Sequence, residues 1–296
     1  MKNSSYYCYA ICISMFFASC TKEATNREGY EGEVKFNASY YQDAQTKADI
    51  PFTVGNKSTI IGYQSGDPVS TSSPVSGTPL EATCNTGSVL TPQNSLYLPK
   101  GSYDFYSVST NSESAPALTF VSGTSGQLAN KKDYLWSKVS GVNEGGTVNF
   151  VYAHKAVGLE LNILEGSGIN SLSVTLIEIT PSKADASSTM NLATGAITPS
   201  SSTDEFKPMT VSGTKGKYIM LPLASKAINI KVTTNVTIGG TSVTGKVYTG
   251  TIPSQSYAGG SYYTLNLYVT ANEMIFAGAT VQDWTTQSIS DITLIE

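Results

Sequence analysis

The sequence predicts an all-β protein of the β-sandwich class. From Glu31 onward, short apolar segments are separated by clusters of Gly, Ser, Asn and Pro, and such clusters are typical of the turns between strands. Leu159, Leu161 and Ile163 alternate with other residues, which is the period of a strand with one face in the core. No segment has a convincing helical period. Many short strands in two groups favour a sandwich architecture.

The predicted strands follow one another at short intervals. The first alternates through Val34, Phe36 and Ala38. In segment 171–179 the apolar residues change face at Ile177, which indicates a β-bulge. The remaining predicted strands cover residues 58–63, 88–98, 103–109, 148–152, 157–164, 218–223, 227–233, 242–252 and 262–270.

Polar segments divide the chain between these strands. Residues 68–79, 181–188 and 199–204 are rich in Ser, Thr, Pro or Asp and are predicted to be loops. Gly and Asn also interrupt the strand pattern at 141–146. We therefore expect a domain boundary there, with one domain over 31–143 and a second over 144–296.

The N-terminus resembles a bacterial lipoprotein signal. One Lys precedes a mostly apolar stretch, residues 6–17, which is far shorter than the about 20 residues that span a bilayer. Small residues then lead to Cys20, and polar sequence follows at once. The resemblance implies that 1–19 is a signal peptide, that Cys20 carries lipid and that 20–30 is a linker. The chain is then expected at the outer membrane, on the cell surface. An ordinary secretory peptide cut nearby is the alternative.

Composition limits what else the chain could do. Its charged residues make up 14% and its net charge is −4, so nothing favours nucleic acid as a partner. Of four cysteines, Cys8 and Cys12 leave with the signal and Cys20 carries the lipid. Only Cys84 remains, and the mature chain therefore has no intramolecular disulfide. Its stability must come from hydrophobic burial.

The sequence offers no catalytic, metal or cofactor site. His154 is the only histidine, and a zinc site commonly needs three or four ligands. No G-x-S-x-G elbow and no D-x-D-x-D-G calcium loop occur. We therefore expect His154 to be packed and hydrogen-bonded. The stretch 213–217 has the Gly and Lys of a phosphate loop without its spacing, and a hairpin turn explains it better. We expect a protein that is not an enzyme.

Several stretches, in this order and spacing, resemble the fimbrillin family of Bacteroidales, whose members build type V pili. The stretches are 98–106 (LPKGSYDFY), 133–136 (DYLW), 150–157 (FVYAHKAV), 191–198 (NLATGAIT), 221–222 (LP), 260–267 (GSYYTLNL) and 281–284 (VQDW). The resemblance implies two transthyretin-like β-sandwich domains in series. It also implies a role as a pilus subunit or a related surface lipoprotein.

The resemblance further implies assembly by β-strand donation to other pilin subunits, in which a neighbour's strand fills a sandwich edge. In similar stalk subunits a protease removes an N-terminal strand, often after an arginine, and Arg27 is the only arginine here. Residues 21–26 are polar and show no strand pattern. Cutting after Arg27 would therefore remove the tether but no strand. This favours an anchor or accessory subunit that keeps its lipid, although a cut beyond the first strand and a merely solvated Arg27 remain open.

The C-terminal segment 288–296 is the candidate donor strand, through Ile289, Ile292 and Leu294. Equally, it could be the last strand of its own domain. The competing function is a surface adhesin, a module that binds glycan or a host protein and does not polymerise. A host or bacterial surface ligand is therefore a further candidate partner.

Overall fold

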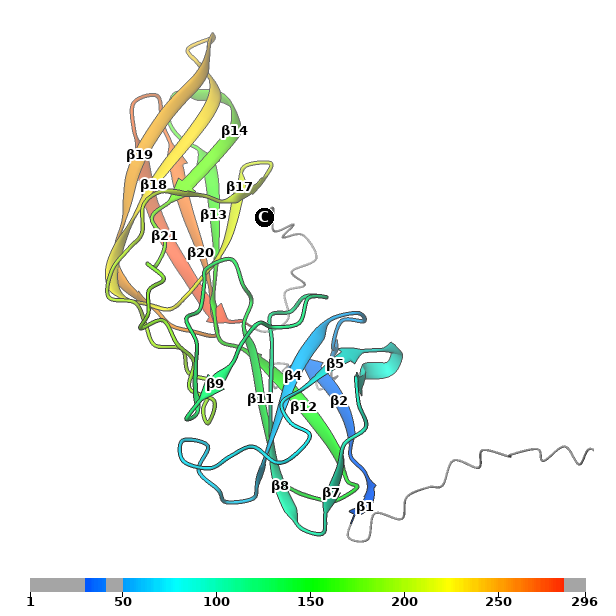
Figure 1. Ribbon diagram of the computed structural model, residues 1–296. Helices are drawn as coiled ribbons and strands as arrows, with labels where there is room; N and C mark the ends of the chain where they lie inside the picture. The colour runs from blue at the N-terminus through cyan, green and yellow to red at the C-terminus, as the bar shows by residue number, and fades with distance from the viewer. Residues whose placement is uncertain (1–29, 41–49, 285–296) are drawn as a thin grey trace, which may run out of the picture.

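The computed structural model describes residues 30–40 and 50–284. This part of the chain contains no α-helix, and its one helical element is a 3-10 turn, Thr86–Ser88. The all-β prediction is confirmed. The molecule is elongated, with one group of strands in the lower half of Figure 1 and a second in the upper half. The division into two transthyretin-like domains stays a prediction.

The strands are short in the first half of the chain and longer in the second. In chain order they are β1 (Tyr30–Glu33), β2 (Lys35–Tyr40), β3 (Ile50–Pro51), β4 (Lys57–Gln64), β5 (Leu80–Cys84), β6 (Val89–Pro92), β7 (Tyr97–Pro99), β8 (Ser102–Ser109), β9 (Phe120–Val121), β10 (Thr124–Ser125), β11 (Leu135–Asn143), β12 (Thr147–His154), β13 (Val157–Glu165), β14 (Ile169–Ile179), β15 (Lys207–Pro208), β16 (Thr210–Ser212), β17 (Lys215–Met220), β18 (Leu223–Ile238), β19 (Thr241–Tyr257), β20 (Ser261–Val269) and β21 (Met274–Asp283).

The lower strands form a sheet that closes on itself. Its order is β12-β11-β8-β4-β5-β6-β2-β3, and β12 also pairs in parallel with the whole of β2. Closure removes free sheet edges, so β2 is held on both sides. Inside, the ring of Phe36 lies edge-on to Phe105 at 5.6 Å and stacks on Phe150 at 6.2 Å between centroids. Such aromatic contacts stabilise a core beyond the burial of their area.

The upper strands form two facing sheets. One has the order β16-β17-β13-β20-β21 and the other β15-β14-β18-β19. Leu161 and Leu265 of the first sheet belong to the same buried cluster as Ile230 and Ile252 of the second. Because the inner faces of both sheets share one apolar core, this part of the molecule is a β-sandwich.

A third buried cluster combines residues of the lower strands, such as Val108 of β8, with residues of the upper ones, such as Tyr262 of β20, and it also includes Leu192 and Trp284. This cluster forms the waist between the two groups of strands. The segment between β14 and β15 reaches down to it. The backbone N–H of Leu128 donates to the carbonyl of Ser188 at 2.7 Å, and the indole N–H of Trp136 donates to the carbonyl of Leu192 at 2.8 Å. The waist is therefore a packed and hydrogen-bonded contact.

The change from the closed sheet to the sandwich falls between β12 and β13. The expected domain boundary at 143/144 lies in the hairpin between β11 and β12, and β12 remains in the lower sheet beside β2. This pairing joins segments that are far apart in the sequence, so local patterns could not indicate it. β12 belongs to the closed sheet and β13 to the sandwich. The chain therefore passes from one to the other at Lys155 and Ala156, after the expected boundary.

The predicted strands correspond to observed ones, with two kinds of difference. Segment 88–98 contains two strands, β6 and β7, rather than one. No prediction covered β5, β11 or β21, nor the short strands β1, β3, β9, β10, β15 and β16. The bulge expected near Ile177 is confirmed by a register shift between Val174 and Leu176. Segment 213–217 is part of the β16–β17 hairpin, as predicted.

Candidate assembly interface

Two upper strands lie at sheet edges on the same side of the molecule (Figure 1). Among the described residues β21 pairs only with β20, and β19 pairs only with β18. Within residues 30–40 and 50–284, the outward-facing backbone N–H and C=O groups of both strands therefore take part in no β-ladder. An exposed edge of this kind is a template for pairing with another strand.

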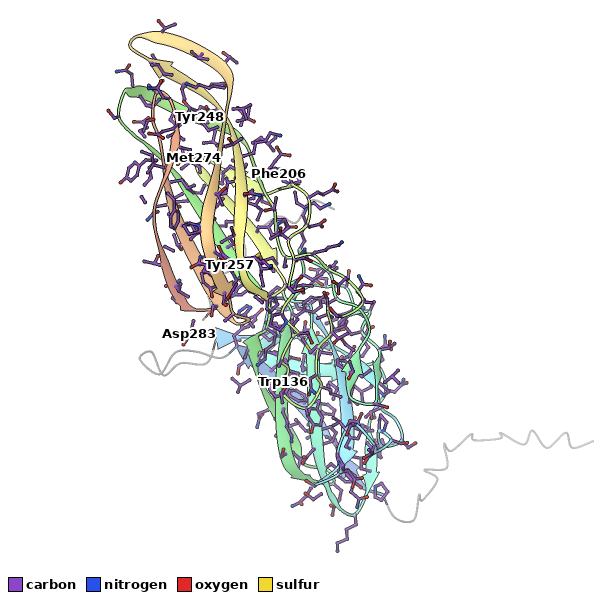
Figure 2. All side chains as sticks on the ribbon, turned by 90° about the vertical axis from the view of Figure 1, so that its left-hand side faces the viewer. Trp136, Phe206, Tyr248, Tyr257, Met274 and Asp283 are labelled. Atoms are coloured by element: carbon purple, nitrogen blue, oxygen red, sulfur yellow. The ribbon has the colours of Figure 1, made fainter. Side chains whose placement is uncertain are left out.

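The upper ends of these two edges are closed against each other. A Cβ at Gly250 of β19 would lie 2.8 Å from the Cε atom of Met274, so the missing side chain makes room for the methionine. The Tyr248 hydroxyl donates to the carbonyl of Thr270 at 3.0 Å. Lys246 donates to the carbonyl of Ala271. Figure 2 shows Tyr248 and Met274 near each other at this end.

The lower end of β21 is open. Ala279 lies opposite Leu265, and Val281 lies opposite Tyr263. Directly opposed residues of an antiparallel pair point to the same face, and Leu265 and Tyr263 belong to the sandwich core. Ala279 and Val281 therefore face the interior side, yet both are exposed, and Val281 keeps 55% of its surface accessible.

We call residues 279–283 of β21 the open edge. All of its side chains are exposed. Asp283, at its lower end, is at the waist in Figure 2. The core behind it is sealed by Tyr263, whose hydroxyl donates to the carbonyl of Ser256 at 3.2 Å and whose ring lies 4.9 Å from that of Tyr257. Within the part of the chain that the structure describes, the outer backbone of the open edge is thus unpaired, and its inner face carries the apolar Ala279 and Val281.

Sequence reasoning missed β21 because a bulge interrupts its alternation. Phe276 faces the core opposite Leu267, but Gly278 lies opposite Asn266, so Ala277 is an extra residue. Gly278 has a positive φ of 133°. The apolar residues shift phase at this point, as they do at a β-bulge. Gly278 within an apolar run was the signal that could have indicated it.

β1 lies at the lower end of the molecule in Figure 1. β1 pairs with β7, and the N–H of Val34 donates to the carbonyl of Leu96 at 3.0 Å. Beside β7 is a pocket of about 340 Å³, whose lining includes Val75, Leu98 and Tyr103.

The predicted site residues fall outside the described ranges. These are Cys20, Arg27, Ile289, Ile292 and Leu294. Their roles in lipidation, processing and strand donation stay predictions. The described chain begins at Tyr30, shortly after Arg27, and ends at Trp284, shortly before the candidate donor strand.

The one histidine is packed and hydrogen-bonded, as predicted. His154 is buried, and its Nδ1 lies 2.7 Å from an Oδ1 of the buried Asp133. No group of three or more candidate metal ligands occurs within the described residues. Over the same ranges, none of the helical structure is long and apolar enough to cross a membrane.

Buried tyrosines serve as fixed hydrogen-bond groups. Burial raises the pKa of the Tyr152 hydroxyl, which contacts Ser107 and Ser58. Burial, and then the carboxylate of Glu160, raise the pKa of Tyr262, which donates to that carboxylate at 3.1 Å. Burial also raises the pKa of Tyr218, to about 12. All three phenols stay protonated at neutral pH, and those of Tyr152 and Tyr262 serve as hydrogen-bond groups in the interior.

The fold is similar to those of solved proteins of Bacteroidales. The structure matches a proposed cell adhesion protein from Bacteroides uniformis with a TM-score of 0.59 and 17% identity, over 86% of this chain and 98% of the other. A fimbrial protein from Bacteroides vulgatus matches with a TM-score of 0.57 and 11% identity, over 85% and 99%. The tip fimbrial protein Mfa3 from Porphyromonas gingivalis matches with a TM-score of 0.51 and 11% identity, over 86% and 99%.

Sequence comparison gives the family directly. A comparison with curated proteins finds no match. The family model described as fimbrillin-like matches residues 43–284, which is most of the chain. The residues of this match include β21 with its open edge, the waist and most of the closed sheet. The chain therefore belongs to the fimbrillin-like family.

Proposed function

We propose that this protein is a non-enzymatic surface lipoprotein and a subunit of a type V pilus, in an anchor or accessory position. Membership in the fimbrillin-like family supports a pilus-related role. The observation in this chain that carries the proposal is the open edge of β21. An unpaired strand with exposed core-facing residues is what assembly by β-strand addition requires.

In the proposed assembly, a neighbour's extended segment pairs with the open edge. Its backbone hydrogen-bonds to β21, and its alternate side chains cover Ala279 and Val281. Segment 288–296 is the candidate donor, and in extended form it spans about 30 Å at about 3.3 Å per residue. The open edge has five of the residues of β21 and is about 16 Å long on the same scale. About half of the segment would therefore pair with it.

The lipid on Cys20 is proposed to be retained. Each acyl methylene contributes about 0.8 kcal/mol to membrane binding, so several chains make a durable anchor. β1 begins at Tyr30. A cut after Arg27 would free the protein from the membrane without removing β1 or β2. Such a cut opens no acceptor site, which supports a subunit that keeps its tether at the outer membrane.

Two measurements on protein taken from the cell surface test this proposal. Intact mass and N-terminal sequencing should give a lipidated N-terminus at Cys20. A new N-terminus near Glu28, or beyond β2, would overturn the retained anchor. Deletion of residues 288–296 should abolish heat-stable ladders on gels. Ladders that persist in the deletion would contradict strand donation by this segment.

The pocket beside β7 favours a second candidate function, a surface adhesin. Its volume of about 340 Å³ is within the range of small-molecule sites, about 300–1,000 Å³. Tyr97 on its wall is exposed and could contact a sugar ring. Binding of glycans by a protein that remains monomeric after proteolysis would favour this function over the pilus subunit.

A further inference from the structure

The first strand of the closed sheet and the last strand of the sandwich end at the same histidine ring. Tyr40 is the final residue of β2, and Trp284 directly follows β21. The ring of Trp284 stacks on His154 at 4.3 Å between centroids with a 5° interplanar angle. The ring of Tyr40 is also nearly parallel to His154, at 6.3 Å and 5°. These distances are typical of stacked aromatic pairs.

A network of hydrogen bonds fixes the histidine and the tyrosine together. The Tyr40 hydroxyl donates to Oδ1 of Asn111 at 2.6 Å, and Nδ2 of Asn111 donates to Asp133 at 2.8 Å. Asp133 in turn contacts Nδ1 of His154 at 2.7 Å. All of Tyr40, Asp133 and His154 are buried. The same Oδ1 of Asn111 also accepts from Nδ2 of Asn56 at 2.8 Å, so loss of Tyr40 removes one of its two donors.

Trp284 depends on its ring contacts more than on polar ones. Its side chain is only 4% exposed, yet its indole N–H finds no hydrogen-bond partner among the described residues. Its backbone N–H donates to the carbonyl of Gly260 at 2.7 Å, and Tyr262 meets its ring edge-on at 6.0 Å. One face of the indole is thus covered by His154, whose position depends on Asp133 and Tyr40.

We propose that β2 and the end of β21 are energetically coupled through His154, so that displacing β2 loosens Trp284. Tyr40 then holds the imidazole in place, and the imidazole holds the indole. The use of this coupling rests on the proposed function: in a subunit that keeps β1 and β2, the closed sheet would hold the waist end of β21, and with it the open edge, in position for a neighbour's strand. The coupling itself is a property of one molecule and needs no assembly. By linkage it is reciprocal, so loosening Trp284 must also loosen β2.

Hydrogen exchange on the monomeric full-length protein tests the coupling. Tyr40→Leu should raise exchange at the Trp284 amide and along residues 279–284 by roughly two- to tenfold, the range expected for one aromatic contact. Phe36→Leu is the matched control. It perturbs the same strand and the same closed sheet, but Phe36 packs on Phe105 and Phe150 rather than on His154.

Two further variants separate the ring contact from general destabilisation. His154→Gln keeps an N–H donor for Asp133 and removes the ring, so Tyr40→Leu should then add no further exchange at Trp284. Tyr40→Phe keeps the stacking ring and loses the hydroxyl, which separates the ring from the hydrogen-bond network. In the reverse direction, Trp284→Leu should raise exchange in residues 36–40, whereas Tyr268→Leu on the exposed outer face should not.

Three results would overturn the proposal. Equal loosening of Trp284 by Tyr40→Leu and Phe36→Leu would mean that only global stability is involved. An undiminished effect of Tyr40→Leu in the His154→Gln background would exclude the histidine. Unchanged exchange at residues 36–40 in Trp284→Leu would violate the required reciprocity. Failure of the protein to form ladders would contradict the proposed function and leave this coupling intact.

Discussion

Replacing Val281 with lysine should block assembly while leaving the monomer stable. The side chain keeps 55% of its surface exposed in the isolated chain, so the substitution should change unfolding free energy by no more than about 0.5 kcal/mol. Under an added strand, the remaining half of the valine contributes about 1 kcal/mol, from about 1.5–3 for a whole side chain. Ordering a lysine there costs up to about 2 kcal/mol. The predicted loss is about 2–3 kcal/mol, or about 30- to 150-fold in association.

Urea denaturation of the monomer and gel ladders of surface-derived protein measure the two halves of this prediction. Val54→Lys is the matched control, because Val54 is 59% exposed and lies outside β19 and β21. The control should form ladders like the wild type. Normal ladders in Val281→Lys, or a monomer destabilised by several kcal/mol, would refute the assignment of Val281 to an acceptor edge.

Three other perturbations test the anchor and the fold. Cys20→Ala should move the protein from the membrane fraction to the medium or periplasm, and membrane retention of this variant would contradict lipidation. Gly195→Ala should lower the unfolding free energy by about 2 kcal/mol or more in urea denaturation, because φ is +69° and the new Cβ would lie 2.5 Å from the Trp136 ring. Gly213→Ala is the control, with φ +61° and no atom within 4 Å of the new Cβ. It should lower the unfolding free energy clearly less. For Asp104, burial opposes ionisation, but hydrogen bonds from Ser65 and the Gly141 N–H, together with Lys138, hold the pKa of Asp104 below its ordinary value. The ionised Asp104 carboxylate therefore stabilises the folded state above about pH 4, and this stabilisation is lost as pH falls through the lowered pKa. In urea denaturation measured as a function of pH, Asp104→Asn should therefore reduce the loss of unfolding free energy at acid pH. An unchanged loss would contradict this role of Asp104.

The sequence predicted strands wherever one strong alternation ran without interruption. β13, with Leu159, Leu161 and Ile163 inward, is such a case. β5 also alternates, but its buried residues include the small Ala82 and Cys84, which give a weak signal. β21 was not predicted, because the bulge at Gly278 interrupts its alternation. Period-two reasoning therefore works locally and fails where side chains are small or the phase changes.

Pairings between distant segments could not be predicted from local patterns. The parallel contact of β2 with β12 places the first strand beside a segment that sequence reasoning assigned to the second domain. The packing of His154 was predicted because it is the one histidine of the chain, but its stacking with Tyr40 and with Trp284 was not. That contact depends on three segments meeting at the waist. The open edge likewise appears only when both sheets are placed together.

The central claim is that a neighbour's C-terminal segment pairs with the open edge, and a mixed disulfide tests it most directly. Two full-length variants, Val281→Cys and Ile292→Cys, would be co-expressed on the same cells and oxidised. Cys84 is buried and does not compete. The account predicts a disulfide between the two different chains that neither variant forms alone. Absence of this heterodimer would contradict the account. So would a disulfide that forms only within a single chain carrying both substitutions, because segment 288–296 would then be the last strand of its own sandwich rather than a donor.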